Sequence, residues 1–177
     1  MEIKGSNTTS SQRVREMVQI ALMTAITYVS ASFLNIPNGY GGVVHLGDTM
    51  IFVTAILFGT RQAAISGALA MTMFDGFSPY AAYAPYTFVI KLMMALILGL
   101  IANSGDARGT NWIKNIIGIV LAGAWGVAGY FGAETIMYGN YAAAVPGILG
   151  NVIQVSAGGA IAVVLIVALK KTKYFNR

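Results

Sequence analysis

Ionisable side chains are rare in the apolar parts of this sequence, and those found there are the residues best able to do chemistry. They are His45, Asp48, Asp75, Lys91 and Glu134. His45 is the only histidine in the chain, and it lies with Asp48 in the glycine-rich segment N-I-P-N-G-Y-G-G-V-V-H-L-G-D, residues 35–48. Burying a charged group in apolar surroundings is costly. Such groups therefore indicate either internal ion pairs or a site for a polar small molecule.

The sequence lacks the patterns of several common catalytic and cofactor sites. It contains no G-x-x-x-x-G-K-[ST] loop for ATP phosphates, no H-E-x-x-H zinc motif and no G-x-S-x-G nucleophile elbow. The single histidine, the dispersed acidic residues and the absence of cysteine argue against a metal site. We therefore expect a protein that is not an enzyme and that needs no cofactor or metal.

The composition of the chain is that of a membrane protein. Of its 177 residues, 56% are hydrophobic and only 10% are charged, whereas a soluble domain carries about 25% charged residues. Glycine, which is more frequent in transmembrane helices than in soluble ones, occurs 21 times. These values predict an all-α integral membrane protein with a single membrane domain over residues 1–177.

Apolar runs separated by short polar segments predict six transmembrane helices. We expect them at residues 14–34, 43–59, 63–74 with an extension to 77, 85–103, 113–138 and 146–169. The segments around them should include a flexible N-terminus, a short turn and a basic tail, at residues 1–12, 139–145 and 170–177. The fifth helix carries a seam of small residues that predicts close packing against another helix. The seam is Gly118, Ala122, Gly126 and Gly129.

The distribution of Lys and Arg predicts how the helices are oriented. With six spans both termini lie on the same side, and ten of the eleven basic residues then fall on that side. They are Lys4, Arg13, Arg15, Arg61, Arg108, Lys114, Lys170, Lys171, Lys173 and Arg177. The positive-inside rule makes this side the cytoplasm. The net charge of +5 is thus explained by topology, and no nucleic-acid partner is needed.

Polar residues also gather on the predicted outer side, in the loops and the outer ends of the helices. Beside the five ionisable residues they are Asn35, Asn38, Tyr40, Tyr80, Tyr83, Tyr86, Tyr138, Asn140, Asn151 and Gln154. Such a mixture of aromatic and polar groups is typical of a small-molecule site. We interpret residues 35–48 as the lid of that site, with His45 and Asp48 at the membrane edge or just inside it.

Lys91 is open to three interpretations. It lies six residues after Pro85 in the fourth predicted helix, roughly 9 Å along its axis. Its long side chain could extend to the lipid headgroups, it could form an ion pair with Asp48, Asp75 or Glu134, or it could contact the ligand directly. Direct contact would favour an anionic substrate.

The other candidates also have structural as well as functional interpretations. Glu134 could be an acid facing water at the interface, and His45 could be an internally bonded loop residue. Asn151 and Gln154 are one helical turn apart and could either read a flat polar ligand or tie neighbouring helices together. Trp125 could pack in the core, face the lipid or stack on a ligand, and Tyr40, Tyr83 and Tyr86 are further candidates for stacking.

Two segments resemble the S components of energy-coupling factor (ECF) vitamin transporters. Ala21 and Ala25 in A-L-M-T-A are similar to the AxxxA docking motif of the first helix in that family. The stretch G-G-V-V-H-L-G-D-T-M-I-F-V-T-A-I-L-F-G-T-R-Q-A-A-I-S-G-A-L-A, residues 41–70, resembles hydroxymethylpyrimidine- and pyridoxine-type members. Chain length, six spans and cytoplasmic termini extend the resemblance over the whole chain.

The resemblance implies a subunit of the bacterial cell membrane that binds a vitamin or vitamin precursor from outside. It would deliver this substrate through a transmembrane coupling subunit and two ATPase subunits, which alone would bind ATP, with Ala21 and Ala25 as the docking face. Together with the polar inventory it implies the following substrate-binding residues: Tyr40, His45, Asp48, Tyr83, Tyr86, Lys91, Glu134, Asn151 and Gln154. Pantothenate or another vitamin is the alternative substrate.

Two other functions remain open from the sequence. A stand-alone secondary transporter could couple to protons through Asp48, Glu134 and Lys91, although the chain shows no obvious internal repeat of the kind many such transporters have. A membrane enzyme with a site built from loops is the third possibility.

Overall fold

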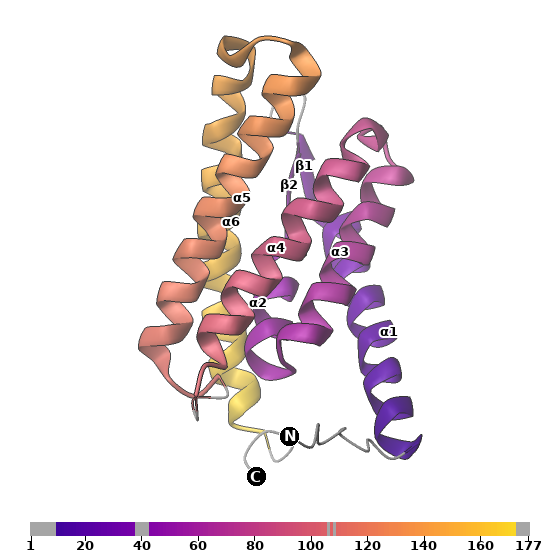
Figure 1. Ribbon diagram of the computed structural model, residues 1–177, viewed down its shortest axis with the longest axis vertical. Helices are drawn as coiled ribbons and strands as arrows, with labels where there is room; N and C mark the ends of the chain where they lie inside the picture. The colour runs from indigo at the N-terminus through magenta and orange to yellow at the C-terminus, as the bar shows by residue number, and fades with distance from the viewer. Residues whose placement is uncertain (1–9, 38–42, 106, 108, 173–177) are drawn as a thin grey trace, which may run out of the picture.

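The computed structural model describes residues 10–37, 43–105, 107 and 109–172, which form six helices and one small hairpin (Figure 1). The elements are α1 (Ser10–Phe33), β1 (Asn35–Pro37), β2 (Val43–His45), α2 (Gly47–Leu57), α3 (Thr60–Gly76), the short 3₁₀ helix η1 (Ala81–Tyr83), α4 (Ala84–Ala102), α5 (Trp112–Tyr138) and α6 (Tyr141–Lys170). The predicted all-helical fold and the helix count are confirmed for these residues. The extent of the domain over residues 1–177 stays a prediction.

Four of the six helical segments are long and apolar enough to cross a membrane. They are Ser10–Phe33, Ala81–Ala102, Trp112–Tyr138 and Tyr141–Lys170. α3 has 17 residues and α2 only 11, so α2 is roughly 16 Å long and is shorter than the hydrocarbon core of a bilayer. The predicted number of helices is confirmed, and the two runs predicted to be short, α2 and α3, are the helices that do not reach spanning length and hydropathy.

The short helix α2 is the centre of the bundle. It contacts α1, α3, α4 and α6, and nine of its eleven residues are buried. Its side chains Ile51 and Phe52 are fully buried in the hydrophobic core. A helix that is apolar on every side is stable only when other helices surround it, which explains why this one lies inside the bundle.

The second helix begins later than predicted because a hairpin precedes it. Asn35 pairs with His45 and Pro37 with Val43 in an antiparallel ladder. Val43 and Val44 are β-branched and therefore favour the extended backbone. The hairpin was not predicted, because three-residue strands are too short to show alternation in the sequence. The loop between its strands, residues 38–42 with Tyr40, lies outside the described residues.

Two further predicted boundaries are wrong. α6 begins at Tyr141 and not at Pro146, because Gly139 ends α5 with a left-handed φ of 62° and the Asn140 side chain caps α6 by accepting from the Ala142 N–H. Pro146 lies within α6, near the end where only one backbone hydrogen bond is lost. At the N-terminus residues 10–12 are helical; residues 1–9 of the segment predicted to be flexible lie outside the described part.

The predicted glycine seam of α5 packs closely on α4. A Cβ atom at Gly118 would lie 2.6 Å from the Leu98 side chain, and one at Gly126 would lie 2.9 Å from Met94. Only glycine permits this separation, so the prediction of close packing is confirmed. This contact fixes α5, which carries Glu134, relative to α4, which begins directly after Tyr83 of η1.

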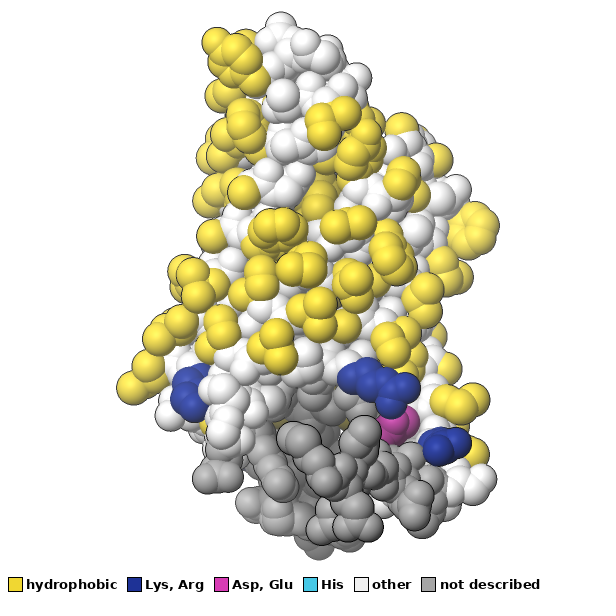
Figure 2. Space-filling model, in the orientation of Figure 1, with side chains coloured by type: hydrophobic (Ala, Val, Ile, Leu, Met, Phe, Trp, Pro, Cys, Tyr) yellow, Lys and Arg dark blue, Asp and Glu magenta, His cyan; other side chains and the backbone are white. Residues whose placement is uncertain are grey.

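The charged groups of several helices meet at one end of the molecule. Arg61 at the start of α3 contacts Glu16 near the start of α1 at 3.0 Å. Lys170 at the end of α6 donates to the Gly109 carbonyl in the α4–α5 connection at 2.5 Å. On the face shown in Figure 2, the Lys, Arg and acidic side chains lie at this lower end, and hydrophobic side chains are spread over the surface above them. The starts of α1 and α3 and the end of α6 therefore share one side, and its assignment to the cytoplasm stays a prediction.

Candidate functional site

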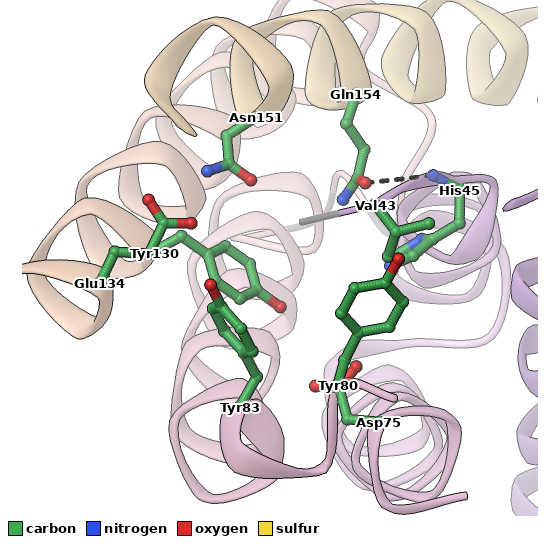
Figure 3. Close-up of a pocket in the computed structure, with 9 residues that line it drawn as sticks. All are labelled: Val43, His45, Asp75, Tyr80, Tyr83, Tyr130, Glu134, Asn151 and Gln154. Carbon is green, nitrogen blue, oxygen red and sulfur yellow. Dashed lines mark hydrogen bonds between the residues drawn. The ribbon is translucent and has the colours of Figure 1, made fainter. Parts of the chain in front are cut away.

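A pocket lies between β2, the end of α3, η1, α5 and α6, away from the charged end (Figures 1 and 3). Its cavity volume is about 40 Å³, and the space between the lining atoms comes to about 410 Å³ when the part open to solvent is counted. Its lining residues are Val43, His45, Asp75, Tyr80, Tyr83, Tyr130, Glu134, Asn151 and Gln154. Segments far apart in the sequence thus bring aromatic, amide and acidic side chains to one place.

Three tyrosines form the aromatic part of the lining. The Tyr83 hydroxyl lies 2.8 Å from the Tyr138 hydroxyl. This contact joins η1 to the end of α5. The Tyr130 hydroxyl lies 3.1 Å from the Thr87 hydroxyl. These bonds hold two of the rings in place at one end, and their faces are able to pack on a flat ligand.

Asp75 and Glu134 are the acidic groups of the pocket. Their residues are only 5% and 4% exposed, yet Oδ2 of Asp75 and Oε2 of Glu134 have no hydrogen-bond partner among the described residues. A buried oxygen without a partner is unfavourable, and most buried polar atoms in proteins are paired. The fold itself therefore leaves one oxygen of each carboxylate buried and without a partner.

Gln154 connects the pocket to the structure below it. Its Nε2 donates to Asp48 Oδ2 at 2.8 Å, and its Oε1 accepts from the His45 backbone N–H at 3.2 Å (Figure 3). The amide thereby links α6 to both α2 and the hairpin strand β2. Asn151, one turn earlier on α6, also lines the pocket and is half-buried.

Beneath the pocket, Lys91 and Asp48 form a buried ion pair. Nζ of Lys91 lies 2.5 Å from Oδ1 of Asp48, and the side chains are 1% and 0% exposed. The ammonium group also lies 4.9 Å from the centroid of the Tyr130 ring, within the range of a cation–π contact. Asp48 is in the first turn of α2, where the helix dipole favours a negative charge. Of the three interpretations of Lys91, the structure supports the internal ion pair.

His45 is held as a neutral ring. Its Nδ1 accepts from the Gly47 backbone N–H at 3.2 Å, and the ring makes an edge contact with Phe74 at 5.2 Å between centroids. Burial lowers the pKa of His45 to about 4, so the imidazole is uncharged at neutral pH and Nε2 carries the proton. The ring braces the start of α2 at the edge of the pocket.

The structure brings together five of the nine predicted substrate-binding residues: His45, Tyr83, Glu134, Asn151 and Gln154. Asp48 and Lys91 do not line the pocket but pair beneath it. Tyr86 lies instead beside an apolar groove between α4 and α5, together with Trp125, whose indole donates to the Ile90 carbonyl. Tyr40 lies outside the described residues. Whether any of these side chains binds substrate stays a prediction.

Four lining residues are not among those predicted to bind substrate: Val43, Asp75, Tyr80 and Tyr130. Asp75 and Tyr80 belong to the polar inventory of the outer side, so a signal for both is present in the sequence. Tyr130 precedes Glu134 by four residues and therefore shares its helix face. Val43 carries no such signal, because an apolar residue in an apolar chain is not distinctive.

The two alanines predicted to dock a partner lie on the outside of α1. Ala21 and Ala25 are exposed and line an apolar groove whose other wall includes Leu69 and Met73 of α3. This position leaves them accessible to another helix, and their docking role stays a prediction.

Comparison with known proteins shows the family of the chain. The sequence model of the family described as ECF-type riboflavin transporter, S component, matches residues 11–171. The chain is 26% identical to the thiamine precursor transporter HmpT of Lactococcus lactis subsp. cremoris (strain MG1363) over 168 residues, 94% of each chain. It is also 30% identical over 117 residues to an uncharacterized protein of Pyrococcus woesei, covering 66% of this chain and 75% of that one. The chain therefore belongs to the family of ECF-type transporter S components and is a multi-pass protein of the bacterial cell membrane.

Proposed function

We propose that this protein is the substrate-binding subunit of an ATP-driven ECF importer and that its substrate is hydroxymethylpyrimidine. The observation that carries the proposal is the composition of the pocket, in which two buried carboxylates with unpartnered oxygens accompany three tyrosines. The similarity to a thiamine precursor transporter over nearly the whole of both chains supports the same class of substrate.

The chemistry of an aminopyrimidine suits this lining. Its flat ring is able to pack on the tyrosine faces. Its exocyclic amine is able to donate to a carboxylate of Glu134 or Asp75, and hydrogen bonds to ionised acceptors are stronger than neutral ones. The amide of Asn151 offers both a donor and an acceptor, which matches a ring nitrogen beside an amine.

Anionic vitamins suit the pocket less well. Pantothenate would be favoured by a free Lys91, but that ammonium group is paired with Asp48.

Riboflavin is the second candidate substrate, because the matching family is described by that vitamin. Pyridoxine is a third flat heterocycle that the same groups could bind.

Energy and delivery would come from partner subunits. The sequence has no ATP-phosphate motif, so we infer that a coupling subunit and two ATPases supply ATP hydrolysis and that this chain needs no cofactor of its own. The exposed alanine face of α1 is the proposed contact with the coupling subunit. A stand-alone proton-coupled transporter is the alternative. Two of the three residues proposed to carry its protons, Asp48 and Lys91, are however bound to each other in an ion pair.

Ligand identification and calorimetry test the proposed substrate. We expect mass spectrometry of the purified protein to find hydroxymethylpyrimidine, and titration with hydroxymethylpyrimidine, pyridoxine, riboflavin and pantothenate to give the tightest binding for the first. Glu134→Gln and Asn151→Ala should each weaken that binding by about tenfold or more, whereas Tyr86→Phe, outside the pocket, should not. Preferred binding of another vitamin, or unchanged affinity in both pocket variants, would contradict the proposal.

Transport assays separate the two mechanisms. In proteoliposomes we expect uptake only when the coupling subunit, the ATPases and ATP are present. Uptake by this chain alone, driven by a pH gradient without ATP, would support the secondary transporter instead.

A further inference from the structure

Asp75 and Glu134 give the pocket an acidic lining from two sides. They come from α3 and α5 and lie on opposite sides of the space drawn in Figure 3. Both residues are more than nine-tenths buried, and each has one carboxylate oxygen without a partner among the described residues. A molecule bound between them would lie between two acids, each with an oxygen that the fold leaves without a partner.

Little in the chain could offset this negative charge. None of the nine described lining residues is Lys or Arg, and residues 38–42, which lie outside the described part, contain neither in the sequence. The nearby cation, Lys91, is bonded to Asp48 at 2.5 Å. The other basic residues that the structure describes belong to the opposite ends of the helices; they are Arg13, Arg15, Arg61, Lys114, Lys170 and Lys171. Among the described residues, a bound anion would therefore find no free cationic partner in the pocket.

The position of the Glu134 carboxylate depends on a glycine of α6. A Cβ atom built at Gly147 would overlap Oε2 of Glu134. Any larger residue at this position would therefore push the carboxylate away from α6. Gly132 lies on α5, the helix that carries Glu134. A Cβ atom at Gly132 would meet nothing within 4 Å, so a larger residue there should leave the carboxylate in place. The two glycines offer a matched pair of sites for substitution.

We propose that Asp75 and Glu134 select the unphosphorylated form of the substrate and reject its phosphate monoester. The selected molecules present hydrogen-bond donors or positive charge to the two acids. A phosphate group adds up to two negative charges, which repel both carboxylates and have no cation to compensate them. This inference rests on the proposed function of the pocket as a vitamin site and adds the charge class that the site accepts.

A titration of the wild-type protein tests the inference without any variant. Calorimetry at pH 7.5 in 0.15 M salt would compare three alcohols with their phosphate monoesters, namely those of hydroxymethylpyrimidine, pyridoxine and riboflavin. We expect the alcohol of the bound pair to bind at least about 100-fold more tightly than its ester, because two like charges act at short range in a poorly hydrated site. Equal affinities, or tighter binding of the ester, would overturn the inference.

Charge-neutral variants test which residues carry the selection. In Asp75→Asn with Glu134→Gln, the ratio of ester to alcohol dissociation constants should fall below about tenfold, because the alcohol binds more weakly and the ester binds more tightly than to the wild type. Glu16→Gln, which removes an acid at the opposite end, should leave the ratio unchanged. Gly147→Ala should reduce the ratio and Gly132→Ala should not. A ratio that stays at its wild-type value in the double variant would overturn the assignment to these two residues.

The same data distinguish failure of the inference from failure of the proposed function. If pyridoxine or riboflavin binds and hydroxymethylpyrimidine does not, the proposed substrate is wrong, and the ratio measured for the vitamin that binds still decides the inference. If none of the six compounds binds, both are overturned.

Discussion

Replacing Lys91 alone should destabilise the protein much more than replacing Lys91 and Asp48 together. The two side chains are almost completely buried and bonded at 2.5 Å. In Lys91→Met, the carboxylate of Asp48 keeps only the donor of Gln154 at 2.8 Å and becomes an uncompensated charge in the core. In the double variant with Asp48→Asn, no charge is left behind, and the new amide is still able to bond Gln154.

The size of the effect follows from the burial of the pair. Breaking a buried ion pair by removing one partner lowers the free energy of unfolding by about 3–5 kcal/mol. For a chain of this length that corresponds to a fall in the unfolding midpoint of roughly 6–20 °C. Replacing both partners with neutral groups is often close to neutral, so the double variant should lie within about 2 kcal/mol of the wild type.

Thermal unfolding in detergent, followed by the fluorescence of Trp112 and Trp125, measures these differences. Arg61→Met is the matched control, because it breaks the Arg61–Glu16 pair, whose side chains are 72% and 33% exposed. Exposed pairs contribute at most about 1 kcal/mol. A double variant as unstable as the sum of the single variants would refute the view that the charges act as a pair.

Three other predictions concern the lid, its histidine and the docking face. Gln154→Leu should weaken substrate binding, measured by calorimetry, by about tenfold or more, because β2 loses its hydrogen bond to α6. Gln154→Glu should also bind substrate weakly, since a second acid would face Asp48. Because the pKa of His45 is lowered to about 4 in the fold from an unfolded value of about 6.5, the stability from its neutral ring is fully present above pH 6.5 and is lost as the pH falls toward 4. The unfolding midpoint should therefore drop over that range, and less so in His45→Asn; equal slopes would contradict this. Changing Ala21 and Ala25 to Leu should abolish ATP-driven transport while binding persists, and transport that survives would remove the docking role.

The number of helices and their shared charged end were predictable because the distribution of Lys and Arg reports them, whereas the side of the membrane that this end faces stays a prediction. Arg61, Lys114 and Lys170 begin or end three different helices, and placing them on one side requires the correct number of crossings. The structure bears out the shared end through the contacts of Arg61 and Lys170. The length of α2 was less accessible, since apolar residues continue from β2 into the helix and hide the point where the backbone changes from extended to helical.

The sequence predicts which polar residues gather on one side of the protein, but not how they are arranged around the pocket. The sequence places Asp75, Tyr80 and Glu134 on the same side of the membrane, but it does not say which of them face each other. That depends on the register between α3 and α5, which is fixed by packing against α4 rather than by local sequence. For the same reason the partner of Lys91 stayed open, because pairing with Asp48 depends on how α2 and α4 are aligned.

The unpartnered oxygen of Glu134 should make the ligand-free protein less stable than it could be. The residue is 4% exposed and its Oε2 has no partner among the described residues; leaving such a group buried lowers stability by about 1–3 kcal/mol. Glu134→Met, which has a similar shape and no oxygen, should therefore raise the unfolding midpoint of the ligand-free protein by a few degrees while reducing binding.

Thr135→Val is the matched control on the same helix. Its hydroxyl already donates to the Phe131 carbonyl at 2.8 Å, so its loss should not stabilise the protein. Sites that bind ligands often carry such a conflict between stability and function. A midpoint that falls in Glu134→Met would mean that the carboxylate already serves the fold, and the case for Glu134 as a group reserved for substrate would then fail.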